Sequence, residues 1–531
     1  MNFFSKVLSG LPRPASLVLS VASSVLLALS FPDFEISLLA WIAFIPFLFA
    51  IMLEKERHLA TFLAGWLFGT VFFFITCWWL TFAPITYAGF PVIPTYLLLL
   101  GATAAAGVFS GFFGLIYGLV RRAFGAAAVL SAPFIWIAFE FARCWLTGNN
   151  WNAVGYSQAF NPNLIQNASI GGVALTGFVV VLASALAVFA IESVIDWKSD
   201  KASFRPRTLI TVFLLLLLPG LSLAPSLLSQ KQTDFEGDPV VSEIIAVQPN
   251  VPMSGLDFSK WRALRKRQTD LAESELGKIE NRERPVTVVL PESPMNFQYA
   301  LDPEFKDYID GFARNNQVSV LFNSAEPDPS RERGFFNSAV LVGPDGGMVR
   351  QYDKIHLLPF GEFVPLPEFA QGLIPPMVGR FSHGSEYDLF DLGGGKAGVM
   401  ICFESHFGSL SAEYARNGAD LIIEMTNDGY LGPTPVLRQH LANAVFRAVE
   451  TGRPVLRVTN VGVTAMIDQH GKISDRADTY TEAVRHWPVK KVSRGQTFYV
   501  LAGEWFSILC VLVSVGLVVF ATVSGRRKRV P

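Results

Sequence analysis

Three residues of the sequence have side chains suited to covalent acyl transfer: Glu292, Lys354 and Cys402. A cysteine thiol has an ordinary pKa of about 8.5, so it needs a base to become a strong nucleophile. Glu292 is a candidate for that base, provided that burial raises its pKa toward neutrality. Lys354 is a candidate for stabilising the oxyanion of the tetrahedral intermediate, together with the backbone N–H of Phe403. The three side chains therefore predict thiol-dependent acyl transfer.

Each of these residues also has an ordinary structural interpretation. A glutamate after a strand is commonly a cap or loop residue, a lysine beside an aspartate is commonly a surface pair, and a lone cysteine is commonly a small core residue. Zinc binding by Cys402 with the nearby His356, His383 and His406 is not favoured, because no second cysteine or tight ligand spacing accompanies them. We therefore expect no metal and no cofactor.

The three residues lie at the ends of predicted strands within residues 235–495, a region of ordinary soluble composition. Short apolar strands alternate there with helical stretches. The predicted strands are 241–248, 285–291, 317–323, 396–402, 420–425 and 454–459, and the predicted helices are 258–280, 408–417 and 437–451. Glu292 follows the second of these strands, Cys402 ends the fourth, and Lys354 follows a hairpin strand. The alternation predicts an α/β sandwich.

The remainder of the chain is predicted to span a membrane. The sequence is 51% hydrophobic and 16% charged, with a mean hydropathy of +0.37, whereas soluble proteins are about 25% charged. Most apolar stretches approach or exceed the roughly 20 residues that a spanning helix needs. They are 15–31, 34–53, 60–80, 92–120, 126–146, 171–195, 208–225 and 502–523. We predict a bundle of eight helices: seven in a membrane domain (1–230) and one at 500–523, which follows the catalytic domain (235–495) and precedes a basic tail (524–531).

Charges in the loops predict the orientation. The short connections near 32–34, 81–91 and 147–170 contain no lysine or arginine, whereas the alternate connections and the C-terminal tail are basic. Positively charged loops stay in the cytoplasm. Both termini are therefore expected inside and residues 226–501 outside. The net charge of −1 gives no indication of nucleic-acid binding.

Three sequence blocks resemble the signatures of the nitrilase superfamily. They are LPES, DKIHLLPFGEFVP and ICFES, and they carry Glu292, Lys354 and Cys402 at separations of 62 and 48 residues. The resemblance implies a nitrilase-like αββα sandwich with a Glu–Lys–Cys triad. Together with the preceding apolar spans and the strings TNDGYLG and HLANAVFRAVETGRPVLRVTN, the whole chain resembles the apolipoprotein N-acyltransferase family.

This second resemblance implies an activity, partners and a location. It implies a multi-pass protein of the bacterial inner membrane whose catalytic domain is periplasmic. The fatty acyl group of a phospholipid, typically phosphatidylethanolamine, is expected to pass through a cysteine thioester to the α-amine of S-diacylglyceryl-cysteine in an apolipoprotein. Two alternatives stay open. One is a membrane-tethered carbon–nitrogen hydrolase (amidase or nitrilase) acting on a small amide, and the other is a transporter or receptor with an inactive nitrilase domain.

The family resemblance also implies residues that support the triad. Glu362 in PFGEF and Glu404 in CFES match family positions with that role, although each has an alternative as a loop carboxylate or a surface pair. The family commonly has tyrosine where this chain has Phe403 and tryptophan where it has Tyr430. Both departures keep an aromatic ring, so they concern the pocket more than the chemistry.

Two further features carry open interpretations. The stretch 359–381, rich in proline, phenylalanine and leucine, is either a buried lid or a lipid-facing gate for the acyl chain. Its candidate gate residues, with one from a later loop, are Phe363, Phe369, Leu373 and Tyr430. Glu140 and Arg143 lie three residues apart within the fifth span, on one helical face. They are either a functional pair or a structural pair that serves helix packing.

Overall fold

The structure is a computed structural model, and the residues described are 10–54, 57–148, 150–197, 213, 237–279, 282–292, 295, 297–332, 334–359, 361–364, 381–492 and 495–527. The chain divides into two compact units, which are treated separately below. The first comprises Met1–Lys231, Thr434–Ala442 and Ala502–Pro531, and the second comprises Gln232–Pro433 and Asn443–Leu501. The domain boundaries expected from composition stay a prediction.

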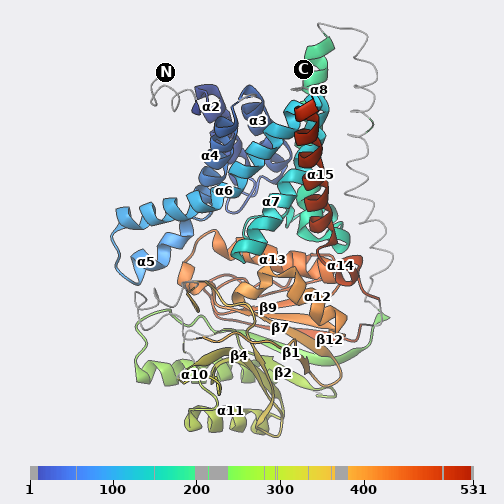
Figure 1. The fold of residues 1–531 in the computed structure, drawn as a ribbon. Coiled ribbons are helices and arrows are strands. Elements are labelled where there is room, and N and C mark those ends of the chain that lie inside the picture. The colour runs from blue at the N-terminus through green and yellow to red at the C-terminus, as the bar shows by residue number, and fades with distance from the viewer. Residues whose placement is uncertain are drawn as a thin grey trace. The chain divides into compact units, whose positions relative to one another are not determined.

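The first unit is helical in its described part (Figure 1). Its helices are α2 (Pro14–Ala28), α3 (Ala40–Leu53), α4 (His58–Thr76), α5 (Phe82–Thr86), α6 (Val92–Phe124), α7 (Ala132–Thr147), α8 (Ala168–Trp197) and α15 (Trp505–Arg527). Four described stretches are long and apolar enough to cross a membrane: His58–Thr76, Val92–Thr147, Ala168–Ile195 and Trp505–Val523. The predicted span 208–225 lies outside the described residues except for Phe213, so the count of eight stays a prediction.

Small residues allow the helices of the first unit to approach closely. A Cβ atom added at Gly65 of α4 would lie 2.2 Å from the carbonyl oxygen of Ser110 in α6, and one at Gly114 of α6 would lie 2.3 Å from that of Thr61 in α4. Only glycine fits such contacts. Close packing of small residues is a major source of helix association in lipid, where the hydrophobic effect contributes little.

The second unit contains two six-stranded sheets. One has the order β12-β1-β2-β3-β4-β5, and the other has the order β11-β10-β9-β8-β7-β6. The first sheet consists of β1 (Val240–Gln248), β2 (Val286–Val289), β3 (Ser319–Pro327), β4 (Phe335–Val342), β5 (Met348–Asp353) and β12 (Ala483–Lys490). The second consists of β6 (Leu389–Asp391), β7 (Lys396–Ile401), β8 (Leu421–Thr426), β9 (Val455–Thr459), β10 (Ala465–Ile467) and β11 (Ile473–Ser474).

Helices cover the sheets of the second unit (Figure 1). They are α10 (Phe258–Leu276) and α11 (Pro303–Asn316) on the first sheet, and α12 (Gly408–Arg416) on the second. Helix α13 (Val436–Thr451) belongs to this unit from Asn443 onward, and α14 (Phe498–Ala502) up to Leu501. The α/β sandwich predicted from the alternation of strands and helices is confirmed.

Parallel pairing determines where the polar residues meet. Strands β7, β8 and β9 pair in parallel, as do β1, β2 and β3. The carboxyl ends of parallel strands lie along one edge of a sheet, where α/β proteins commonly place their sites. Strands β7, β8 and β9 are buried on both faces except at Lys396, the first residue of β7.

Candidate active site

Cys402 follows the last residue of β7 and begins a short 3₁₀ turn, Cys402–His406. Its φ angle is +52°, in the left-handed region that a residue with a Cβ atom rarely adopts. Cys402 is partly exposed. Strained backbone at a strand end commonly marks a functional position. The conformation therefore supports a functional role for this cysteine over a core-filling one.

Glu404 ties this turn to the segment that carries Lys354. Its Oε1 atom accepts hydrogen bonds from the Tyr352 hydroxyl at 2.7 Å and from the N–H groups of Ile355 at 2.8 Å and His356 at 3.1 Å. Its Oε2 atom accepts from the N–H of Ile401 at 2.9 Å. Burial raises the pKa of Glu404 to about 7. The surface-pair alternative is wrong, because this side chain is fully buried.

Lys354 is buried against a carboxylate. Its Nζ atom donates to Glu362 at 2.9 Å, and the other oxygen of Glu362 accepts from the N–H of Leu358 at 2.7 Å. Burial opposes the charge on Lys354, but the neighbouring Glu362 and Glu292 carboxylates outweigh it and raise the pKa of this lysine. Lys354 is therefore a fixed cation, and Glu362 holds it in place.

Glu292 lies against the cysteine and is held by uncharged donors. Its carboxylate is hydrogen-bonded to Cys402. Oε1 accepts from the side-chain Nδ2 of Asn337 at 3.2 Å, and Oε2 accepts from the backbone N–H of Asn427 at 3.2 Å. Burial is the main cause that raises the pKa of Glu292. A raised pKa suits a general base that works near neutral pH.

Residues from three separate blocks of sequence thus meet around one sulfur atom. Lys354 is close enough for its charge to act on both Glu292 and Cys402. Burial and the Glu292 charge raise the pKa of the Cys402 thiol, and Lys354 lowers it. An acceptor, a cation and a thiol in one site can remove a proton from sulfur and then stabilise negative charge on an attacked carbonyl.

Comparison with known proteins gives the family. Residues 23–186 match the apolipoprotein N-acyltransferase N-terminal domain, and residues 265–492 match the carbon-nitrogen hydrolase family. An apolipoprotein N-acyltransferase of Geobacter metallireducens is 31% identical over 521 residues, which cover 97% of this chain and 96% of that protein. The chain belongs to the apolipoprotein N-acyltransferase family. A second relative with that name, from Photobacterium profundum, is 26% identical and covers 92% of each chain.

Membership in the apolipoprotein N-acyltransferase family confirms the predicted family and the prediction of an acyltransferase. Together with the four apolar helical stretches, it identifies a membrane protein. Among solved structures, Nit3 of Saccharomyces cerevisiae, a nitrilase-superfamily member, is 18% identical with a TM-score of 0.36, covering 48% of this chain and 91% of its own.

The predicted gate is only partly within the described residues. Phe363 packs edge-on against the ring of His383, with ring centroids 5.2 Å apart. Tyr430 is 47% exposed in the turn after β8. Phe369 and Leu373 lie outside the described residues. The lid and gate interpretations of 359–381 both stay predictions, as does the oxyanion role of the Phe403 N–H.

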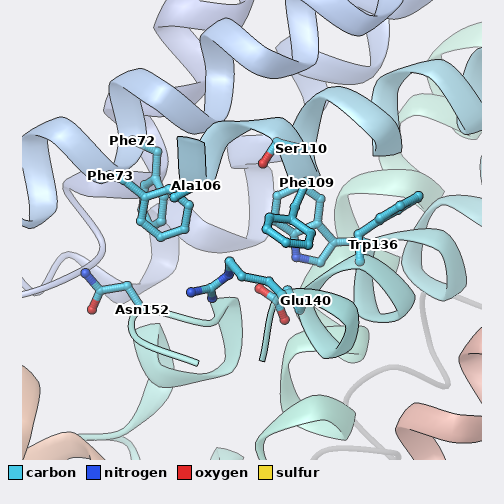
Figure 2. A pocket seen from close by; sticks show the side chains of 10 residues that line it. Phe72, Phe73, Ala106, Phe109, Ser110, Trp136, Glu140 and Asn152 are labelled. Atoms are coloured by element: carbon cyan, nitrogen blue, oxygen red, sulfur yellow. The ribbon is translucent and has the colours of Figure 1, made fainter. Parts of the chain in front are cut away.

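Glu140 and Arg143 of α7 line a pocket of the first unit (Figure 2). Half of the residues that line it are aromatic. Its lining residues are Phe72, Phe73, Ala106, Phe109, Ser110, Trp136, Phe139, Glu140, Arg143 and Asn152. Glu140 accepts the N–H of Val154 at 2.8 Å, and the guanidinium of Arg143 lies 5.0 Å from the centroid of the Phe73 ring. The functional and structural interpretations of the pair both stay open.

Sequence reasoning did not select the asparagines that hold the carboxylates. Asn337 donates to Glu292 and also to Glu362, the latter at 2.6 Å, and its own Oδ1 accepts from Asn323 at 2.6 Å. The feature that could have identified Asn337 is its position as a polar residue within the apolar strand FFNSAVLV. Asn427 lies in TNDGYLG, directly after β8.

Proposed function

We propose that this chain is an apolipoprotein N-acyltransferase that works through a thioester on Cys402. It takes a fatty acyl group from a phospholipid and transfers it to the N-terminal α-amine of S-diacylglyceryl-cysteine in an apolipoprotein. Two lines of support converge: the relatives that bear this name over nearly the full chain, and the site in the second unit. The observation that carries the proposal is the Cys402 thiol hydrogen-bonded to Glu292 beside the Lys354 ammonium.

The first half-reaction forms the thioester. Glu292 accepts the thiol proton, and the Cys402 sulfur attacks the ester carbonyl carbon of the phospholipid. Lys354 stabilises the resulting oxyanion. When the intermediate collapses, the ester C–O bond breaks, Glu292 returns the proton to the departing oxygen, and a lysophospholipid leaves. The acyl group remains on sulfur.

The second half-reaction forms the amide. The neutral α-amine of the acceptor attacks the thioester carbonyl, and Glu292 accepts a proton from the amine nitrogen. The C–S bond then breaks, and the proton on Glu292 returns to the Cys402 sulfur. Conversion of a thioester to an amide is energetically downhill, so no nucleotide is consumed. Both half-reactions use the same base, cation and sulfur, which fits a ping-pong sequence.

The donor and the location extend this proposal. Phosphatidylethanolamine is the expected donor in the bacterial inner membrane. The basic connections and tail support an orientation with both termini in the cytoplasm and residues 226–501 in the periplasm. That placement gives the site access to the phospholipids and lipoproteins of the outer leaflet.

The decisive experiment follows a labelled acyl chain. The purified full-length protein is incubated with acyl-labelled phosphatidylethanolamine, first alone and then with a diacylated lipopeptide. We expect label on the protein that hydroxylamine releases, as from a thioester, and its transfer to the peptide amine. Cys402→Ala abolishes both, whereas Cys510→Ala in α15 keeps both. Peptide acylation by the Cys402→Ala protein, or the absence of any thioester in the wild type, would overturn the proposal.

A further inference from the structure

A second set of polar groups approaches the Cys402 sulfur from the neighbouring strand. Thr426 is the last residue of β8 and is fully buried. Its hydroxyl interacts with Cys402 and donates a hydrogen bond to Oδ1 of Asp428 at 3.5 Å. Because β7 and β8 are parallel neighbours, both residues lie at the same sheet edge. Thr426 is therefore placed beside Cys402 by the pairing of the two strands.

A buried ion triplet holds the segment that follows Thr426. Nη2 of Arg457 lies 2.7 Å from Oδ2 of Asp428, and Nη1 lies 2.6 Å from Oε1 of Glu424. Arg457 and Glu424 are 0% exposed, and Asp428 is 2% exposed. The parallel register places Glu424 of β8 directly beside Arg457 of β9. A buried guanidinium bound by two carboxylates fixes all three side chains, since breaking any one pair leaves a charge unbalanced in the interior.

The charges that act on the sulfur come from three elements. Glu292 follows β2, Lys354 follows β5, and Asp428 follows β8. Lys354 and the Thr426 hydroxyl favour the thiolate, whereas the Glu292 and Asp428 charges oppose it. Arg457 reaches Asp428 on the far side of that carboxylate and offsets part of its charge.

We propose that Thr426 is a further catalytic residue, whose hydroxyl turns its hydrogen bond from Asp428 to the Cys402 thiolate when the thiol loses its proton, and that Arg457 is a positioning residue that holds Asp428. The proposal rests on the proposed function, in which the thiolate arises twice. It is the nucleophile of the first half-reaction and the leaving group of the second. One donor on sulfur stabilises both states.

The test measures the thiol directly and needs neither substrate. Alkylation of Cys402 by iodoacetamide in the full-length protein is followed against pH by peptide mass spectrometry, which separates it from Cys77, Cys144 and Cys510. Thr426→Val removes the donor, so we expect the alkylation midpoint to rise by about one pH unit and the rate at neutral pH to fall about tenfold.

Two further variants test the direction in which the alkylation midpoint of Cys402 moves. Asp428→Asn removes a negative charge near the sulfur and weakens the acceptor that competes for the Thr426 hydroxyl, so the alkylation midpoint moves down, opposite to Thr426→Val. Thr426→Ser keeps the hydroxyl and keeps the wild-type midpoint, which separates the donor from the packing of the methyl group. A structural role alone predicts no such opposed shifts.

The matched control is Thr459→Val. Thr459 is the register partner of Thr426, ends β9, is fully buried, and donates its hydroxyl to Gln248 at 3.2 Å. We expect its alkylation midpoint to stay at the wild-type value. An unshifted midpoint in Thr426→Val, or an equal rise in Thr426→Ser, overturns the proposal. If the alkylation midpoints shift as expected but the wild-type protein forms no thioester with phospholipid, the proposed function is overturned instead.

Discussion

Asn337→Asp tests the hydrogen bonds of the site while leaving the fold unchanged. The change keeps size and shape, and Oδ1 still accepts the hydrogen bond from Asn323. It replaces the Nδ2 donor, which now binds Glu292 at 3.2 Å and Glu362 at 2.6 Å, by a carboxylate oxygen. Two attractive contacts become two repulsive ones, and both fall on carboxylates of the site.

The expected magnitude follows from the bond to Glu292. A hydrogen bond to a charged group contributes about 1.5–3 kcal/mol, which corresponds to about one to two pKa units. That shift adds to a pKa of Glu292 that burial already raises. At any pH below the wild-type midpoint of Glu292, its basic form then becomes roughly 10 to 100 times rarer. Thioester formation there slows by the same factor and recovers as the pH is raised, because alkaline pH restores the carboxylate.

The assay is single-turnover thioester formation from labelled phospholipid across a pH series. The control is Asn316→Asp at the end of α11, where the same side chain donates to Glu273 at 3.2 Å on the surface. We expect the control to keep the wild-type rate and midpoint. A wild-type profile in Asn337→Asp would falsify the idea that this amide sets the proton affinity of Glu292. A loss that no pH recovers would point to misfolding, and thermal unfolding of the same sample separates that case.

Three further predictions use the other contacts of the site. Lys354→Met removes the cation, so thioester formation falls on the order of 10²–10³-fold, as single-turnover labelling measures, while the protein still binds phospholipid. Glu404→Gln places an amide nitrogen against one of four N–H or O–H donors and lowers the free energy of unfolding by about 1.5–3 kcal/mol. The melting temperature in detergent therefore falls, whereas the control Glu386→Gln at an exposed position leaves it unchanged. In the wild type, lowering the pH protonates Glu292, so the initial acylation rate falls with a midpoint above the ordinary carboxyl value of about 4.3, and Glu292→Gln shows no such limb.

The members of the candidate triad could be predicted because each follows a recognisable strand and because the three sequence blocks resemble the nitrilase signatures. Glu292 comes after a run of buried β-branched residues, and Cys402 ends another such run. Strand ends are legible from apolar runs, and parallel sheets collect those ends at one edge. The structure brings Glu292, Lys354 and Cys402 together as the nitrilase resemblance implies, and their catalytic roles stay a proposal.

The residues that orient the carboxylates and the sulfur could not be predicted in the same way. Arg457 forms an ion pair with Asp428, which lies 29 residues away in the sequence, and a second ion pair with Glu424, its neighbour on the adjacent strand. No local sequence pattern predicts either ion pair. An arginine inside a strand reads equally well as a surface residue. Asn337 likewise lies in a strand whose side chains point alternately to the two faces of the sheet. Which face is turned toward the site is determined only when the sheet is assembled. Such residues become partners only through the register in which the strands pair. Local patterns in a single sequence do not predict that register.

The division of partners around Glu292 explains how a base persists in a site crowded with charge. Lys354 makes its direct hydrogen bond to Glu362, so the cation does not bind Glu292 tightly enough to remove its basicity. Glu292 is instead oriented by two uncharged donors, the amide of Asn337 and the backbone N–H of Asn427. Neutral donors fix direction while lowering proton affinity less than an ion pair does. Burial then outweighs them, and the carboxylate keeps the raised proton affinity that abstraction from a thiol requires.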